Sequence, residues 1–205
     1  MYDHATKSFW STLQGVPVVG PLVGKEIRLK RKYLVTTTWG KWKKRHPNTT
    51  VLSLKTGHRR DYGEGVAYRD YFATDRLMFT VPEIDTRLLN KDSVLAFRNE
   101  NEQVAIAIKY LAKKRIHHDK LGDKKFVALA DAGGTSRAYY VGDLSFKSFN
   151  GTDEAVDDQG RSWRVFEDRL EMKADQGAQK LGRVPSHNVF WFGWVSQFPQ
   201  TRLVK

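Results

Sequence analysis

The six tryptophans of this chain form two triplets with nearly equal spacing, and this pattern constrains the fold more than any other feature of the sequence. The triplets are Trp10, Trp39 and Trp42, and Trp163, Trp191 and Trp194. After a one-residue gap the two halves stay in register at a shift of 152 positions, which also aligns Pro47 with Pro199 and Thr49 with Thr201. Chance pairing of all six tryptophans is very improbable, so the sequence predicts an internal repeat.

Each copy ends in the pattern W-x-x-W-x-x-x-x-P-x-T followed by aliphatic residues, which is typical of a short helix that leads into a strand. Thr37 or Thr38 precedes the first helix and can cap it by accepting an early backbone N–H. Pro47 follows where that helix should have ended, because a proline cannot continue a helix. Lysines surround the indoles of the first helix, whereas the second helix is apolar almost all round. We therefore expect the first helix at the surface and the second in the core.

Two interpretations of the paired indoles are open. Exposed indoles can form a stacking platform for bases or sugars. Buried indoles can instead anchor a core, because each tryptophan buries roughly 150–250 Å². Recurrence at equivalent positions in both copies favours the second interpretation, so all six tryptophans are predicted to be structural anchors.

The rest of the chain has the pattern of a mainly β protein. Short apolar runs that suit strands are separated by turn signals such as Asn150-Gly151 and Asp158-Gln159-Gly160. These runs are 94–97, 104–108, 126–130, 137–141 and 163–172. The predicted fold class is α+β, mainly β, with an internally duplicated unit in which short Trp-bearing helices pack on an antiparallel sheet.

The repeat divides the chain into three parts: residues 1–53, 54–93 and 94–205. The last part is expected to be a complete second unit, in which Trp163 lies 69 residues after Val94. Only nine residues precede Trp10, so residues 1–53 are expected to be the tail of a first, N-terminally incomplete unit. Such a tail would pair with the strands of the second unit, or meet the missing N-terminal half on another chain, or the sequence is a fragment. Its unpaired sheet edge favours self-association or marginal stability.

The positive charge of the chain is concentrated in one segment. Residues 25–60 carry twelve basic side chains and a single acid, so they account for +11 of the total net charge of +12. Such a segment can attract phosphates, acidic lipid surfaces or an acidic partner, or it can simply form a solvated face. No nucleic-acid-binding motif accompanies it, which makes nucleic acid an unlikely partner. No apolar run is long enough to span a bilayer, and neither a signal peptide nor a compartment is readable.

The densest polar cluster of the sequence predicts a binding site for an anion. Arg59 and Arg60 can clamp an oxyanion, Asp61 can orient Arg60 or the nearby His58, and Tyr62 completes the cluster. The alternative is a structural Arg–Asp pair that ties down the connecting segment. His187 stands at the start of the second apolar helix, where it can cap the helix or line a pocket; capping is the favoured role.

The sequence predicts no metal site, no cofactor and no catalytic residue. The chain has no cysteine, which excludes thiol chemistry by its own side chains. His117, His118 and Asp119 are adjacent and therefore point to different sides, and no third ligand stands at a recognisable spacing. An enzyme that works without cysteine would have only His58, Asp61 and His187 to use.

Several strings of the sequence resemble the uncharacterised prokaryotic family called domain of unknown function 3179. They are M-Y-D-H-x-T-x-S-x-W (1–10), G-P-L-x-G (20–24), T-T-W-G-x-W-x-x-x-H-P-x-T (37–49), R-D-Y-G (60–63), D-x-R-L-x-x-K (85–91), R-A-Y (137–139) and H-x-x-F-W-F-x-W-x-x-x-x-P-x-T (187–201). The chain is expected to match the C-terminal part of that family. Ala107-Ile108-Lys109 departs from the A-Y-P of related sequences, which puts any role of that turn in doubt.

The resemblance carries a functional expectation. Family members have a C-P-x-C-type motif upstream of the M-Y-D string, in some with selenocysteine, which implies thiol or selenol redox chemistry. The corresponding place in the second unit, near Ala130–Gly133, has no thiol. The expected function is thus the non-catalytic scaffold or binding portion of a redox-associated protein, whose gene model restarted at Met1 after a UGA codon. The alternative is a basic module that binds a polyanion or an acidic partner.

Overall fold

A computed structural model of the chain describes residues 1–30, 32–82, 84–173 and 179–205, so that Arg31 alone of the basic segment lies outside the described residues. Its first part, up to residue 92, has short elements. They are β1 (Tyr2–Asp3), β2 (Ser8–Ser11), β3 (Val16–Val19), α1 (Trp39–Arg45) and α2 (Arg69–Ala73). The elements of the middle part are β4 (Ser93–Arg98), β5 (Gln103–Ala107), α3 (Ile108–Lys114), β6 (Ile116–Leu121), β7 (Lys124–Ala130) and β8 (Ser136–Tyr140). Those of the last part are β9 (Phe146–Phe149), β10 (Glu154–Asp157), β11 (Ser162–Val165), β12 (Arg169–Met172), β13 (Lys180–Gly182), β14 (His187–Phe190), α4 (Trp191–Val195) and β15 (Arg202–Val204).

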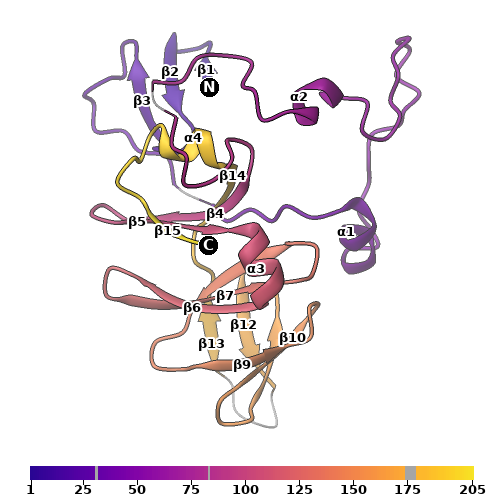
Figure 1. Ribbon diagram of the computed structural model, residues 1–205, viewed down its shortest axis with the longest axis vertical. Helices are drawn as coiled ribbons and strands as arrows, with labels where there is room; N and C mark the ends of the chain where they lie inside the picture. The colour runs from indigo at the N-terminus through magenta and orange to yellow at the C-terminus, as the bar shows by residue number, and fades with distance from the viewer. Residues whose placement is uncertain (31, 83, 174–178) are drawn as a thin grey trace.

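The strands form four sheets, three of which stack on one another (Figure 1). The first of the stack has the order β14-β4-β5-β15, the second β6-β7-β8 and the third β13-β12-β11-β10-β9. All pairings in the stack are antiparallel except that of β15 with β5, which is parallel. The fourth sheet, β1-β2-β3, belongs to the N-terminal part.

The alternation of side chains along β4 explains why the first sheet is buried on both faces. Leu95 and Phe97 point into a core cluster shared with the second sheet, where the rings of Phe97 and Phe126 lie 4.7 Å apart. Val94 and Ala96 point to the opposite face, where they pack under α4. A strand with two buried faces reads as a continuous apolar run, as this one does.

β7 is buried on both faces in the same way. Phe126 and Ala128 contribute to the cluster under the first sheet, and Val127 and Leu129 contribute to the cluster under the third sheet. The second of these clusters surrounds Trp163, which is fully buried. The core therefore has three clusters whose buried residues all lie beyond position 93, although Leu13 and Leu88 pack against the one under α4.

α4 covers the outer face of the first sheet. Trp191 and Trp194 are fully buried, and the indole N–H of Trp194 donates a 2.9 Å hydrogen bond to the hydroxyl of Thr201. The chain then turns back so that β15 adds to the edge of β5. The C-terminal aliphatic residues of the repeat pattern thus form the last strand of the sheet.

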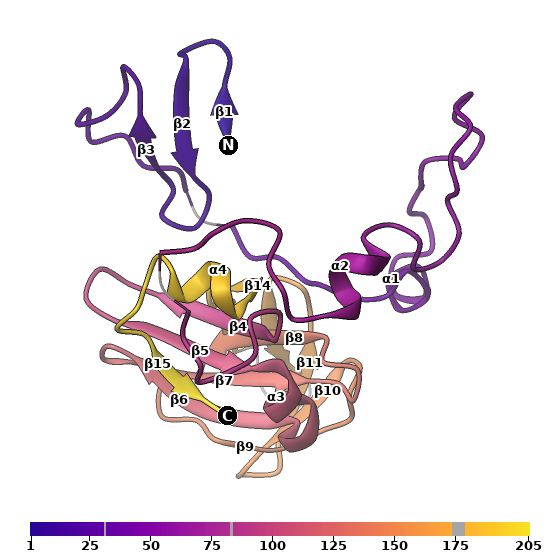
Figure 2. The same ribbon diagram turned by 45° about the horizontal axis from the view of Figure 1, so that its top comes forward.

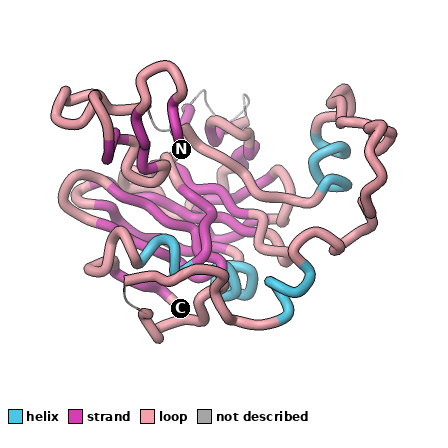
Figure 3. Tube along the Cα trace, turned by 90° about the horizontal axis from the view of Figure 1, so that it is seen from above, coloured by secondary structure: helices cyan, strands magenta, loops and turns pink. Residues whose placement is uncertain are grey.

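The N-terminal part contributes little to this core. Every large hydrophobic side chain that the structure leaves exposed lies within residues 1–89, and every buried hydrophobic side chain of the core lies beyond residue 93. The loop between α1 and α2 extends away from the sheets (Figure 2), and both helices lie outside the block of strands (Figure 3). The described helices include none that is long and apolar enough to cross a membrane.

The predicted fold class is confirmed: the protein is mainly β, with short Trp-bearing helices on antiparallel sheets. The predicted strands correspond to β4, β5, β7 and β8, and residues 163–172 form the hairpin of β11 and β12. Thr38 is the N-cap residue of α1, since its hydroxyl accepts the N–H of Lys41. α1 has no buried residue and α4 has three, as the charge pattern predicted.

Candidate functional site: a cationic cleft beside α1

A cleft of about 660 Å³ lies between α1 and the turns that follow β7 and β9. The first turn contributes residues 131–135 and the second contributes residues 150–153. Five cationic side chains line the cleft: Lys41, Lys44, Arg45, Arg115 and Arg137. The acids Asp131 and Asp153 also line it, so the lining has a formal charge of +3. This is the largest described hollow that gathers several charged side chains.

Polar contacts dock α1 over the cleft. Lys41 Nζ lies 2.7 Å from Asp131 Oδ2, and the hydroxyl of Thr135 lies 3.2 Å from that of Thr37, just ahead of the helix. Asp131 Oδ1 also accepts the N–H groups of Gly133 and Thr135, at 2.8 and 3.1 Å, which fixes the turn. Burial opposes the charged form of Asp131, but the hydrogen bond from Lys41 and the turn amides lower its pKa. Asp131 is thus an ionised carboxylate that binds both α1 and the turn.

Arg45 fixes the far end of α1. Its Nη1 donates to the carbonyl oxygen of Thr152 at 3.0 Å, its Nη2 donates to that of Val165, and its Nε lies 2.8 Å from Glu167 Oε1. Burial, and then the charge of Arg137, lower the pKa of Arg45. All three guanidinium nitrogens therefore have partners, and Arg45 serves as a wall of the cleft.

Glu167 lies beside Arg45 and interacts with three arginines. Arg137 donates to it from Nε at 3.0 Å and from Nη2 at 2.8 Å. Arg183, whose side chain is fully buried, donates from Nη1 to the backbone oxygen of Glu167 at 2.7 Å. Burial opposes ionisation of Glu167, yet the hydrogen bond and charge of Arg137 and the charge of Arg45 lower its pKa. One carboxylate facing three guanidinium groups leaves this side of the cleft with a surplus of positive charge.

Arg115 and Lys44 are the two cations of the cleft that have no ion pair or hydrogen bond with any residue the structure describes. Arg115 ends α3 with a φ of 72°, and its guanidinium lies against Gly151. A Cβ at position 151 would come within 2.6 Å of Arg115 Nη2, so a glycine is needed for this approach. These two side chains are therefore available to a ligand.

The predicted anion clamp lies elsewhere. Arg59, Arg60, Asp61 and Tyr62 occupy the exposed loop between α1 and α2. Asp61 accepts the N–H of Gly63 at 2.8 Å, and the hydroxyls of Tyr62 and Thr56 lie 2.8 Å apart. Neither arginine has an ion pair or hydrogen bond within the described part of the chain, and they do not converge with His187.

His187 lies in β14, with its ring 6.1 Å from that of Trp194. The N-cap residue of α4 is Phe190, three positions further on, so the prediction that His187 caps this helix is wrong. β14 leads directly into α4, and the phenyl side chain of Phe190 cannot accept a hydrogen bond from the N-terminus of the helix. His187 and Arg59–Tyr62 stay predictions as ligand-binding residues.

The pair His117 and His118 points to opposite sides of β6. His117 lies 3.1 Å from the hydroxyl of Tyr110 and 3.4 Å from Asp119, whereas His118 Nε2 accepts the N–H of Phe146 at 2.9 Å. Because it accepts a hydrogen bond, His118 is neutral at this nitrogen, and burial together with the charge of His117 lowers its pKa. The described residues include no cluster of three metal-ligating side chains.

The tryptophans differ between the two halves of the sequence. Trp163, Trp191 and Trp194 are fully buried, whereas Trp39 is 45% exposed. Trp10 and Trp42 are half-buried. An anchoring role in the described fold is thus visible for the second triplet, and for the first it stays a prediction.

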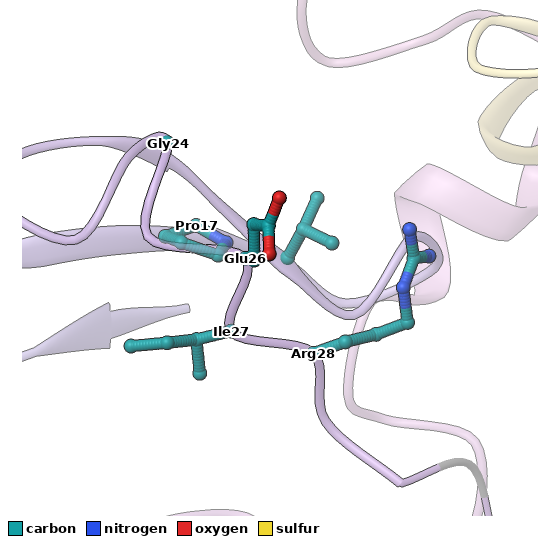
Figure 4. Close-up of a pocket in the computed structure, with 6 residues that line it drawn as sticks. Pro17, Gly24, Glu26, Ile27 and Arg28 are labelled. Carbon is teal, nitrogen blue, oxygen red and sulfur yellow. The ribbon is translucent and has the colours of Figure 1, made fainter.

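A second hollow, of about 480 Å³, lies in the N-terminal part beside β3 (Figure 4). Its lining includes Glu26, Ile27 and Arg28, whose side chains point in three different directions. A binding site needs polar groups that converge on one point. This hollow lacks that convergence, so the cleft beside α1 is the better candidate.

Sequence reasoning missed the cleft because its cations come from distant segments. Lys41, Lys44 and Arg45 belong to the basic segment, which was recognised only as a charged surface. Arg115 and Arg137 stand 70 or more positions further along the chain and carry no local signature. The available signal was the concentration of charge in residues 25–60, which contains three of the five cations.

Comparison with known proteins adds a family and no function. No curated protein and no solved structure matches the chain. A family model described as "protein of unknown function (DUF3179)" matches residues 1–201, which is nearly the whole chain. The chain therefore belongs to the DUF3179 family.

Proposed function

We propose that this protein is a non-catalytic binding module whose cleft beside α1 holds a small oxyanion of the phosphate or carboxylate class. One observation carries the proposal: Arg115 and Lys44 line a five-cation cleft and have no partner among the described residues. A guanidinium presents two parallel donors to an oxyanion, and an ammonium adds a mobile point charge. Thr37 and Thr135 place hydroxyl donors on the same lining.

The chemistry of the lining favours binding over catalysis. Hydrolysis or acyl transfer needs a nucleophile next to a base. The cleft has threonine hydroxyls but no histidine or cysteine. Both of its carboxylates have partners: Asp131 accepts from Lys41 and from turn amides, and Asp153 accepts from the side chains of Asn150 and Thr152. The groups present can hold an anion, and they include no base to activate an attack on it.

The wider role is that of the scaffold or binding portion of a redox-associated protein. Support for this part comes from the resemblance of the sequence motifs, since the family itself is described only as one of unknown function. The chain has no cysteine, so any thiol or selenol would be supplied from outside residues 1–205. The cleft is the place at which such a protein would hold an anionic ligand.

Calorimetric titration with inorganic phosphate and with citrate, at constant ionic strength, tests the proposal. The variant Arg115→Gln/Lys44→Gln should weaken binding about tenfold or more, because it removes the two unpaired donors. The control Arg76→Gln/Lys147→Gln removes the same net charge from exposed positions outside the cleft and should leave the affinity within about twofold. Absence of binding to the unmodified protein, or equal loss in both variants, would refute the proposal.

The alternative function, a basic module for polyanions, predicts a different result. Binding to a polyanion depends on total charge and falls steeply with added salt. Retention of the protein on heparin at physiological ionic strength should then decrease equally in both double variants. Weak retention, with an effect on phosphate binding confined to the cleft variant, would favour the small-anion site.

A further inference from the structure

Residues 39–49 and 191–201 have the same local structure. Trp42 Nε1 donates to Thr49 Oγ1 at 3.0 Å, and Trp194 Nε1 donates to Thr201 Oγ1 at 2.9 Å. The N–H of Thr49 donates to the carbonyl of His46 at 3.1 Å, as that of Thr201 does to Phe198 at 3.1 Å. Each contact recurs at a shift of 152 positions. The two segments therefore make the same helix, turn and indole contact.

The strands ahead of these segments also correspond. The sheet β1-β2-β3 has the same antiparallel order as β10-β11-β12 in the third sheet. Shifted by 153 positions, β3 (Val16–Val19) coincides with β12 (Arg169–Met172). The N-terminal part thus repeats the arrangement of strands and helix that the C-terminal part uses.

The two copies differ in what lies under the helix. In the C-terminal copy β14 pairs with β4, α4 covers β4 and β5, and β15 pairs with β5. The corresponding N-terminal segments are residues 35–38, α1 and residues 50–52. They have no such hairpin among the described residues, and residues 35–38 and 50–52 form no strand. As a result Trp39 is 45% exposed where Trp191 is buried, and Leu52 is 92% exposed.

We propose that residues 35–52 are a docking surface for an apolar β-hairpin of a partner protein. The hairpin takes the place that β4 and β5 have under α4. One of its strands pairs antiparallel with residues 35–38, and the other pairs parallel with residues 50–52. The carbonyl oxygen of Thr38 already accepts the N–H of Trp42. The other backbone groups of these segments, which have no backbone partner among the described residues, supply the hydrogen bonds of strand addition. The indole of Trp39 covers the hairpin as Trp191 covers β4.

The charges on α1 define the partner further. Lys43 stands at the position of Val195, which is 5% exposed against the sheet under α4. The partner therefore carries a carboxylate opposite Lys43, because a lone ammonium at an apolar interface is costly. The hairpin of β4 and β5 has no acid in its strands and carries Arg98, and both its edges are occupied by β14 and β15. A second copy of this chain is accordingly a poor occupant.

Several apolar side chains of the segment are exposed, as such an interface requires. Besides Trp39 and Leu52, the segment exposes Leu34 at 64% and Val51 at 69% just beside or within it. Monomeric proteins rarely leave contiguous apolar patches of more than a few hundred Å² uncovered. A hairpin that covers these apolar side chains removes them from water.

A fusion protein tests the proposal. Residues 93–153 are added ahead of Met1 of the full chain, a junction that keeps the shift of 153 positions and supplies a hairpin to α1. Because that hairpin has no carboxylate, Lys43 is changed by Lys43→Val. Consecutive amides of an edge strand point in opposite directions, so hydrogen exchange of one of the two amides, Val51 or Leu52, should slow about tenfold or more relative to the unmodified chain. The control adds Leu52→Asp and should exchange as fast as the unmodified chain.

Two further measurements decide the remaining cases. If the fusion does not fold, a synthetic hairpin of residues 93–107 with Arg98→Glu is titrated into the unmodified chain, with the same amides as readout. Protection supports the proposal, and unchanged exchange in a folded fusion or with this peptide overturns it. Sedimentation of the unmodified chain at increasing concentration comes first: a dimer that protects Val51 or Leu52 would make a second copy the occupant and also overturn it. Phosphate binding is not a readout here, so this test is independent of the proposed function.

Discussion

The indole nitrogen of Trp194 donates a 2.9 Å hydrogen bond to the hydroxyl of Thr201, and both residues are at most 1% exposed. This bond joins α4 to the residue immediately before β15. The same pair in the N-terminal part, Trp42 and Thr49, makes a 3.0 Å bond in a half-buried setting. The same hydrogen bond therefore occurs once in a buried and once in a half-buried environment.

Trp194→Phe should destabilise the protein by about 2–4 kcal/mol, because it opens a cavity and leaves the buried hydroxyl of Thr201 without its donor. Trp42→Phe should cost less than about 1 kcal/mol, since water can replace the indole N–H. Urea unfolding followed by circular dichroism measures both values. Equal losses in the two variants would contradict the difference in burial.

Glu167→Gln should destabilise the protein by about 3 kcal/mol. The substitution removes the negative charge that Arg45 and Arg137 share, while Arg183 stays beside them. Glu171→Gln is the matched control: its pairs with Arg169 and Lys180 are on the surface, where solvent screens them, and contribute little to stability. Chemical denaturation of the two variants at neutral pH gives the comparison. A cost for Glu167→Gln no larger than that of the control would show that its arginines are solvated.

Acid should weaken the fold through His118 in a window just below pH 6.5. Its pKa is lowered in the folded protein, so the unfolded chain binds a proton more readily and stability falls as the pH drops below the ordinary value of 6.5. The ring is partly exposed, so solvent screens the effect and keeps it small. Melting temperatures between pH 7.5 and 5 should fall less steeply for His118→Gln, whose amide oxygen can still accept the N–H of Phe146. Parallel curves for the two proteins would exclude this role for His118.

Gly134→Ala should destabilise the protein by more than the backbone strain at this position alone would. Gly134 and Gly160 have nearly the same positive φ, 82° and 83°, so an alanine at either position costs about 1–2 kcal/mol of strain. At position 134 the added Cβ would also overlap Cγ2 of Ile108, whereas position 160 is open. Overlap of this kind adds about 1–3 kcal/mol. Thermal unfolding of the two variants should separate them by several degrees, with Gly134→Ala the lower.

The strands of the core were predictable because each is an apolar run between turn signals. Residues 94–97 and 126–130 are buried on both faces, and this burial makes their sequences continuous rather than alternating. α3 was missed because it follows β5 without a break and has Ala107 as an N-cap residue that makes no side-chain hydrogen bond. Local patterns thus revealed elements with strong boundaries and missed one without them.

The candidate site was harder to predict than the fold. Arg59 and Arg60 are dense in sequence, yet their loop brings no other part of the chain to them. Arg115 and Arg137 lie far in sequence from the cations of α1, and only the packing of α3 and β8 beside α1 turns them into a lining. Convergence of distant cations depends on tertiary structure, which neither composition nor spacing encodes locally.

The parallel pairing of β15 with β5 has a consequence for biosynthesis. Arg202 pairs with Val104, so the sheet that holds the apolar centre of the protein is closed only after residues 202–204 have been translated. Until those residues emerge, the nascent polypeptide displays an uncovered strand edge, and α4 is not yet fastened by Thr201. Folding of this sheet therefore waits for residues 202–204, and until then its open edge can pair with other chains.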